Sequence, residues 1–236
     1  DDFMALGRPR LGFLVSSGAM DSMVSNYTAN NKPRSSDAYA HGGEKGHRPD
    51  RALITYVSKI RQAYKGVAVI VGGIEASLRR FSHYDYWSNK VRKSILLDCK
   101  ADLLLYGMGE HSILEVADLL AKGVPVREIR NVRGSCWYTS KESEIPLKDE
   151  NDKSPIFLPS FEEISAQTDE SKTEFAKSFV IQEQNTDSIN ACILVEKSDS
   201  RFVVQNKPAL PLSSDEFDKV MELPYTRRWH PMYDKP

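Results

Sequence analysis

The sequence predicts an α/β protein built on a doubly wound, mostly parallel sheet, followed by a smaller α+β segment at the carboxyl-terminal end. Short apolar runs alternate with amphipathic helical patterns between Leu11 and about Val132. The strand-like runs are continuously apolar, as expected for strands that are covered on both faces. Glycines follow the ends of these runs. Strands that alternate with helices in this way are joined by right-handed crossovers and pair in parallel.

The first predicted strand, Leu11–Val15, is followed by a long stretch without helical or strand periodicity, residues 16–49. Asp50 then predicts a helix N-cap, because its carboxylate can accept hydrogen bonds from the free amides of a first helical turn. The helix that it opens has an apolar face from Leu53 to Tyr64 and is expected to stop at Gly66.

The remaining elements of the predicted core follow the same alternation of apolar runs, glycine turns and helical periodicity. Glycine is expected to end the helix because it adopts the left-handed conformation of a C-cap at no steric cost. These elements are a strand over Val67–Val71 with a turn at Gly72-Gly73, a strand over Asp102–Tyr106 with a turn at Gly107-Met108-Gly109, a helix over Glu110–Lys122 with a stop at Gly123, and a strand over Ile129–Val132.

The character of the chain changes at residue 140, which we take as a domain boundary between residues 1–139 and 140–236. Residues 141–160 are polar and contain three prolines, which predicts a linker or a surface excursion. Beyond it, the pattern predicts a helix over Asp169–Gln184, a β-hairpin formed by Ala191–Glu196 and Phe202–Gln205, and a short helix opened by a capping box of Ser213 and Glu216.

Composition excludes several function classes. The net charge is only −1 with 28% charged residues, so the whole chain gives no electrostatic basis for binding nucleic acid or an anionic membrane. The longest apolar runs, such as Val67–Val71, are too short to cross a bilayer. Cys99, Cys136 and Cys192 are odd in number and far apart, which predicts reduced thiols in a cytoplasmic protein and no metal site. The five histidines show no metal-binding spacing either.

Three glycine-bearing turns are expected to meet at the carboxyl edge of the sheet, where doubly wound folds bind ligands. They are Ser17-Gly18, Gly72-Gly73 and Gly107-Met108-Gly109. The long stretch over residues 16–49 starts at the same edge, and long loops are usually functional or disordered. A dinucleotide fingerprint needs a third glycine, which is absent here, and Glu110 places a negative charge where a phosphate would sit. Tight turns at strand ends are the alternative interpretation.

The segment Ile74–Trp87 concentrates four aromatic residues, a histidine and two arginines. Such a set could hold a phosphate and stack a flat ring, or it could stack the bases of a single-stranded nucleic acid. Alternatively, the aromatic side chains pack under a neighbouring helix while the arginines pair with surface acids. The candidate ligand- or substrate-facing residues of the whole chain are Ser17, Gly18, Asp21, Gly72, Gly73, Glu75, Arg79, Arg80, His83, Tyr84, Gly107, Gly109 and Glu110.

Several blocks of sequence resemble the amino-terminal region of the YgiQ-type (UPF0313-like) radical S-adenosylmethionine (SAM) proteins. The last two blocks resemble the segment that leads into the catalytic barrel of that family. The blocks are Gly18–Val24, Asn26–Ala29, Arg48–Ala52, Gly72–Trp87, Lys100–Glu110, Leu223–Tyr225 with Arg227, and His230–Tyr233.

The resemblance implies a parent protein that binds a [4Fe-4S] cluster through a CxxxCxxC motif and cleaves SAM to a 5′-deoxyadenosyl radical. One loop must supply three thiolates to such a cluster, and the cysteines of this chain are too dispersed for that. We therefore expect the motif beyond Pro236, and the first strand or strands of the family's sheet before Asp1. The domain also resembles the Rossmann-like, cobalamin-binding-type domains, but Asp37 and His41 do not match the DxHxxG signature, so cobalamin is not expected.

Two functions of different classes follow. The first is an accessory, substrate-facing domain of a radical SAM enzyme, which carries no cluster or activity itself and has its own barrel as its partner. The second is an independent module for a nucleotide or single-stranded nucleic acid, with Arg79, Arg80, His83, Tyr84 and Trp87 as its contacts. A third, structural interpretation makes the aromatic segment an interface. The substrate is not indicated by the sequence.

Overall fold

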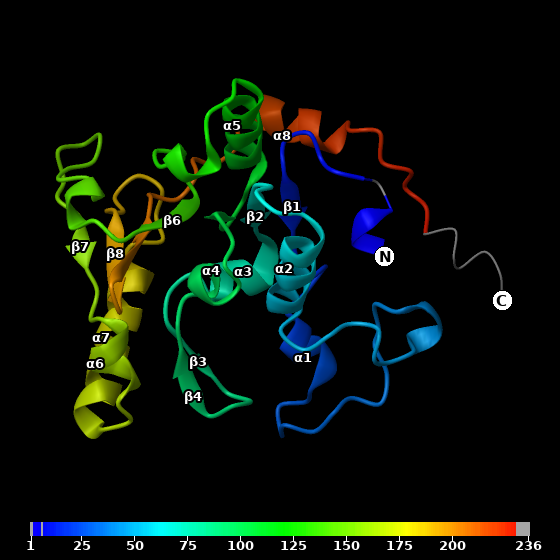
Figure 1. Ribbon diagram of the computed structural model, residues 1–236, viewed down its shortest axis with the longest axis horizontal. Coiled ribbons are helices and arrows are strands. Elements are labelled where there is room, and N and C mark those ends of the chain that lie inside the picture. Colours follow the sequence, from blue (N-terminus) through cyan, green and yellow to red (C-terminus); the bar gives the residue numbers. More distant parts are fainter. Residues whose placement is uncertain (1, 6, 230–236) are drawn as a thin grey trace.

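Seven strands form the main sheet of the computed structural model, which describes residues 2–5 and 7–229. In spatial order they are β1 (Phe13–Val15), β2 (Val69–Val71), β5 (Leu103–Leu105), β6 (Ser135–Thr139), β9 (Arg201–Gln205), β8 (Leu194–Ser198) and β7 (Ile156–Phe157) (Figure 1). β1, β2 and β5 pair in parallel, and so do β7 and β8. β6 and β9 join these two groups through antiparallel pairings. The predicted α/β class is confirmed.

A two-stranded hairpin, β3 (His83–Asp85) and β4 (Lys90–Arg92), projects away from the main sheet (Figure 1). Among the described residues, no helix is long and apolar enough to cross a bilayer. The α-helices are α1 (Ser22–Asn26), α2 (Ala52–Ala63), α3 (Gly73–Leu78), α4 (Ile95–Asp98), α5 (Glu110–Ala121), α6 (Phe161–Ser165), α7 (Asp169–Gln184) and α8 (Ser214–Met221), and the 3-10 turns are η1 (Asp2–Met4), η2 (His41–Gly43), η3 (Val126–Glu128) and η4 (Glu142–Glu144).

Helices cover the parallel part of the sheet on both faces, as the doubly wound prediction requires. On one face, Val69 and Val71 of β2 pack with buried residues of α2, α3 and α4. On the other face, Ile70 of β2 and Leu105 of β5 pack with Val116 of α5. The alternation arises because successive strand residues point to opposite sides of a sheet. α3 and α5 therefore leave β2 and β5 on opposite faces.

The carboxyl-terminal part continues the same sheet. β6 ends at Thr139, next to the predicted domain boundary, and β9 pairs with it along its length. The division into residues 1–139 and 140–236 stays a prediction. The helix over Asp169–Gln184, the hairpin of β8 and β9, and the capping box of Ser213 and Glu216 all form as predicted. Residues 230–233, which contributed to the family resemblance, lie outside the described residues.

Two local predictions differ from the structure. Ile129–Val132 was expected to be a strand, but the strand is β6, which starts after Gly134. Ile129 and Val132 are buried in the core. The side chain of Asn206 donates hydrogen bonds to the Arg130 and Val132 carbonyls, which replace the backbone hydrogen bonds that a neighbouring strand would supply. The predicted linker over residues 141–160 contains the short strand β7.

Candidate functional site

A cleft lies at the carboxyl ends of β1, β2 and β5, with a volume of about 400 Å³. Two of the three predicted glycine turns meet in it, since Gly72, Gly73, Gly107 and Gly109 all line the cleft. Gly73 and Gly107 have φ values of +81° and +68°, in the left-handed region that favours glycine. The geometry thus brings these residues together where ligands bind in doubly wound folds.

Glu110 begins α5 at the rim of this cleft. Its Oε2 atom is shielded from solvent and has no hydrogen-bond partner among the described residues. Among the described residues that line the cleft, none is a lysine, an arginine or a histidine. The carboxylate therefore makes the cleft unfavourable for a phosphate, although the free amides of a helix amino terminus usually attract one.

The third glycine turn opens a neighbouring cavity. Ser17 and Gly18 line a space of about 700 Å³ together with Arg48 and several residues between Asp37 and His47. Ser16 lines both spaces. Arg48 donates to the Met20 carbonyl at 3.4 Å and lies over the ring of Tyr39, at 5.8 Å from its centroid. The two cavities therefore adjoin along one edge of the sheet.

The long stretch over residues 16–49 is more regular than its sequence indicates. It contains α1, whose N-cap Asp21 accepts hydrogen bonds from Met23 N at 2.9 Å and Val24 N at 3.2 Å. Farther along, Asn26 and Tyr27 donate to the Asp50 carboxylate at 2.8 and 2.7 Å. These contacts close the stretch onto the start of α2.

Asp50 does not cap α2, contrary to the prediction. The N-cap position is Arg51, in the left-handed conformation, and its side chain makes no cap hydrogen bond. Acceptors distant in sequence take over this role. Ala52 N donates to Ser22 Oγ at 3.0 Å, and Leu53 N donates to Glu75 Oε1 at 3.2 Å. Local sequence pattern carries no signal for such a tertiary cap.

Glu75 is fully buried and ties three elements together. Its second carboxylate oxygen accepts from Ser22 N at 2.9 Å, while the first accepts from Leu53 N. One side chain of α3 thus serves the amino termini of both α1 and α2, where it also faces the positive ends of their dipoles. Glu75 does not line any cavity described above, so its position is that of an internal anchor.

Arg79 is also engaged inside the protein. It forms an ion pair with the other carboxylate oxygen of Asp21, and both side chains are largely buried. Burial lowers the pKa of Arg79. A second charged cluster, which the sequence did not indicate, lies beside Arg79. In this cluster Asp85 pairs with Arg51 and accepts a hydrogen bond from Ser88 Oγ at 2.5 Å. Burial opposes ionisation of Asp85, but the bonds from Ser88 and Arg51 hold its pKa below the ordinary value.

Arg80 connects α3 to the carboxyl-terminal part of the sheet. Its Nε donates to Gln205 Oε1 at 2.6 Å, and its Nη1 donates to the Ser77 carbonyl at 2.7 Å. The guanidinium also lies over the ring of Tyr106, at 5.3 Å from its centroid. These contacts hold the guanidinium against the protein's own residues on two of its nitrogens and on one face, so the structure places Arg80 as a link between α3 and β9.

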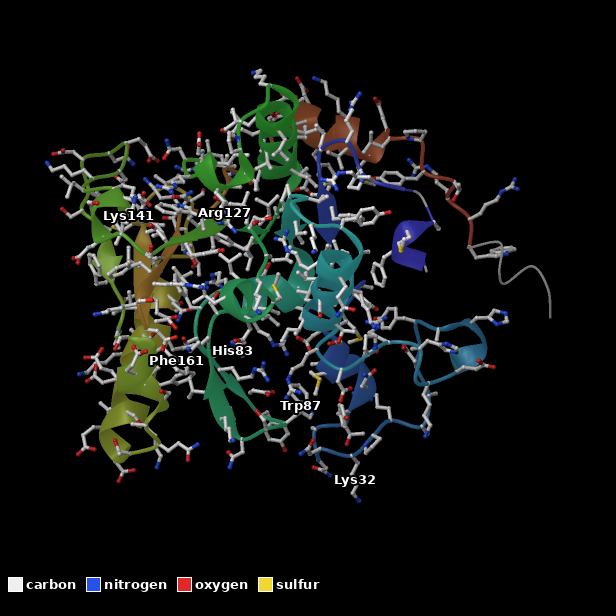
Figure 2. The ribbon with its side chains drawn as sticks, viewed as in Figure 1. Lys32, His83, Trp87, Arg127, Lys141 and Phe161 are labelled. Carbon is white, nitrogen blue, oxygen red and sulfur yellow. The ribbon has the colours of Figure 1, made fainter. Side chains whose placement is uncertain are left out.

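The aromatic segment continues into the β3–β4 hairpin. Figure 2 shows His83 near the base of the hairpin. It shows Trp87 on the side of the hairpin that faces the loop carrying Lys32. Burial, strengthened by the charge of Arg79, lowers the pKa of His83 to about 4, so the imidazole is neutral at pH 7. Tyr84 is 49% exposed, and Trp87 packs against Tyr27 of the loop with ring centroids 6.3 Å apart. Only Phe81 of this group enters the core.

The structure tests how well the thiols could hold the iron–sulfur cluster that the resemblance implies for the parent. Among residues 2–5 and 7–229, no group of three or more potential ligands comes together. Cys99 and Cys136 are buried, and desolvation raises the pKa of each to about 12. Cluster ligation needs thiolates. The cysteines of this chain therefore do not fit an iron–sulfur cluster.

Comparison with known proteins shows a consistent picture. The family model described as "Radical SAM N-terminal" matches residues 1–236. A UPF0313 protein of Clostridium botulinum (strain 657 / Type Ba4) is 51% identical over 234 residues, which cover 99% of this chain and 35% of the relative. A UPF0313 protein of Clostridium perfringens (strain 13 / Type A) is 51% identical over 235 residues, which cover 100% of this chain and 34% of the relative. The chain thus spans about a third of the length of these curated relatives. No solved structure matches the chain.

Proposed function

The chain belongs to the radical SAM N-terminal family, and we propose that it acts as the accessory, substrate-facing domain of a radical SAM protein, with the carboxyl edge of its sheet turned towards the catalytic part. The [4Fe-4S] cluster that the resemblance implies would be held by cysteines other than the three of this chain, and SAM would bind to that cluster. The cytoplasmic location expected from those three cysteines is part of the proposal.

The observation that carries the proposal is an exposed apolar surface at the carboxyl edge. Leu14, Ile74, Leu78 and Met108 are 59%, 49%, 64% and 60% exposed. The strands of a parallel sheet and the helices after them are normally covered, and contiguous exposed apolar patches mark interaction sites. We call these four residues the carboxyl-edge surface.

Contacts within the chain join the four residues into one region. Ile74 and Leu78 lie one turn apart on α3. Ser77 of the same helix accepts a hydrogen bond from Gly107 N at 3.2 Å, and Gly107 precedes Met108. Leu14 lines the cleft together with Gly73 and Gly107. The surface therefore borders the cleft, and a second domain could cover both.

Coverage of this edge suits the chemistry of the parent. A catalytic part closed by a second domain excludes water, and such exclusion prevents side reactions of reactive intermediates. The relatives are about three times as long as this chain, so they contain enough sequence for such a catalytic part. The ordered stretch over residues 16–49 begins at the same edge and would border the shared space.

Substitutions on the carboxyl-edge surface test the proposal. Leu78→Asp and Met108→Asp replace exposed side chains, so this chain should keep its thermal stability within about 0.5 kcal/mol. In the full-length protein the same changes should weaken association of this domain with the catalytic part, measured as increased protease cleavage between them. Leu147→Asp, at a position 88% exposed in a distant loop, is the matched control. Equal cleavage of wild type and both edge variants would contradict the proposal.

A further inference from the structure

A groove of about 890 Å³ follows the amino edge of the sheet, opposite the cleft of the candidate site. Its lining reaches from Leu11, which precedes β1, to Arg201, which begins β9. β2, β5 and β6 lie between these two strands, so the groove crosses four strand spacings. Because neighbouring strands lie about 5 Å apart, this amino-edge groove is about 20 Å long. A compact ligand such as a phosphate ion would fill only part of it.

The apolar part of the lining is aliphatic and partly exposed. It includes the half-buried side chains of Leu97, Leu120, Val124 and Val126. Tyr138 is the only aromatic residue among the described residues that line the groove, and the Arg201 guanidinium lies over its ring at 5.4 Å from the centroid. Single-stranded nucleic acid is usually held by aromatic rings on which its bases stack. The lining therefore suits aliphatic side chains better than nucleobases.

Basic residues dominate the charged part of the lining. Arg61, Lys100, Arg127 and Arg201 stand against one carboxylate, that of Asp102, in a chain whose net charge is −1. The Asp102 charge is already compensated, because its Oδ2 accepts from Arg61 at 2.7 Å and from the Val69 amide at 2.9 Å. The groove therefore presents a local excess of positive charge that the composition of the whole chain conceals.

Three of the basic side chains remain accessible to a ligand. Lys100, Arg127 and Arg201 are exposed. Among the described residues, neither Lys100 nor Arg201 forms an ion pair. Arg127 Nε lies 3.6 Å from Asp102 Oδ1, beyond hydrogen-bond distance, and its side chain is 72% exposed. Lys100 precedes β5 and Arg201 begins β9, two strand spacings or about 10 Å away. The cations are thus spread along the groove, which favours a ligand with several anionic groups.

We propose that the amino-edge groove binds an extended acidic peptide segment of a partner protein, with apolar residues between its carboxylates. An extended chain advances about 3.3 Å per residue, so a groove of about 20 Å holds roughly six residues. Alternate side chains of such a peptide point to opposite sides, so one set can meet the aliphatic lining while the other meets the cations. Arginine clusters are a general means of recognising acidic motifs.

The partner is distinct from the catalytic part of the parent protein, because the proposed function places that part at the carboxyl edge. Its binding is therefore a second function of the chain. Electrostatic complementarity would supply much of the specificity, while the aliphatic contacts would add affinity. The affinity should fall as salt rises, since exposed charges are screened.

Isothermal titration calorimetry of the 236-residue chain with two hexapeptides, both acetylated and amidated, tests the inference. One alternates glutamate and leucine, and the other has glutamine in place of glutamate. The acidic peptide should bind saturably with a dissociation constant below about 1 mM, and the glutamine peptide at least roughly tenfold more weakly. No saturable binding of the acidic peptide would overturn the inference, and so would equal affinity for the two peptides.

The double variant Lys100→Gln with Arg127→Gln removes two cations from the groove. It should bind the acidic peptide roughly tenfold more weakly, with an unchanged circular dichroism spectrum because both side chains are exposed. Lys32→Gln with Lys45→Gln removes the same charge from exposed positions of the stretch over residues 16–49 and should bind like wild type. Unchanged binding in the groove variant, or an equal loss in the control, would contradict the assignment.

Amide chemical shifts of the wild-type chain locate the peptide without any substitution. The Gly66, Lys100 and Gly123 amides, which lie along the groove, should shift on addition of the acidic peptide, while those of Gly73 and Gly107 in the cleft should not. Shifts confined to the cleft would overturn the inference. Tighter binding of a single-stranded RNA hexamer in the groove would also overturn it. These experiments need no catalytic part, so their failure would leave the docking proposal for the carboxyl-edge surface standing.

Discussion

Removal of the Glu75 carboxylate should destabilise the protein strongly, because this buried side chain serves two helix termini at once. The perturbation is Glu75→Ala. This substitution leaves two backbone amides without their acceptor. In the wild type, Ser22 N donates to Glu75 Oε2 at 2.9 Å and Leu53 N donates to Oε1 at 3.2 Å. Both amides are buried, so water reaches them only if the new cavity fills.

The magnitude follows from two lost bonds to a charged acceptor. Each is worth about 1.5–3 kcal/mol, and stranding a buried donor carries a penalty of similar size. Part of this loss is offset, since an ionised carboxylate no longer has to be desolvated. We therefore expect Glu75→Ala to lower the free energy of unfolding by about 3–5 kcal/mol. Glu75→Gln should have a stability between those of wild type and Glu75→Ala. Its side-chain amide retains one acceptor oxygen but turns a donor towards the second backbone amide.

Urea denaturation followed by circular dichroism measures the effect as a shift in midpoint at constant slope. Glu115→Ala, which changes an exposed glutamate of α5, should stay within about 0.5 kcal/mol of wild type. Hydrogen exchange should also accelerate at the Ser22 and Leu53 amides in Glu75→Ala. A loss below about 1 kcal/mol with unchanged exchange at these two amides would refute the assigned role.

Three further predictions concern other parts of the chain. Burial raises the pKa of Glu196 to about 7, so the stability associated with its protonated form is present at acidic pH and is lost as the pH rises through 7. Glu196→Gln should therefore gain stability over wild type by on the order of 2 kcal/mol at pH 8 and by little at pH 5, and a pH-independent difference would contradict this. Lys207 is buried against Asp149 and Glu150, at 3.2 Å from each. Lys207→Met should lower the free energy of unfolding by about 3 kcal/mol in thermal denaturation, because it leaves Asp149 buried without its cation. The double variant with Asp149→Asn should recover part of this loss, and no recovery would argue against the ion pair. For the nucleic-acid alternative, titration with RNA oligomers at two salt concentrations should show weak binding, because Arg79 and Arg80 are engaged internally. Tight binding with a steep salt dependence would instead favour the independent module.

Sequence periodicity was sufficient to predict those helices and strands whose formation depends mainly on their own residues. α5 ends at Ala121, before the predicted stop at Gly123, and the run Val67–Val71 contains the fully covered strand β2. The glycine turns after β2 and β5 could be assigned to one edge because parallel strands end on the same side of a sheet. The cleft of the candidate site was therefore foreseeable in position.

Contacts between residues distant in sequence determine the features that the sequence pattern did not predict. Asp50 carries a local capping signal, but its carboxylate accepts from Asn26 and Tyr27, while Ser22 and Glu75 accept from the amides at the start of α2. Arg79 and Arg80 likewise look available in sequence and are bound to Asp21 and Gln205 in the fold. No local pattern encodes these pairings, because tertiary contacts override local preference.

Hydrogen exchange in this chain alone and in the full-length protein tests the central claim most directly. If the carboxyl-edge surface faces the catalytic part, amides around Leu14, of residues 73–78 and of residues 107–110 should exchange more slowly in the full-length protein. Residues 123–127 line a groove at the opposite edge of the sheet, and the amides of Gly123, Val124, Val126 and Arg127 should exchange equally in both. Protection at that opposite edge, with unchanged exchange along the carboxyl edge, would contradict the account.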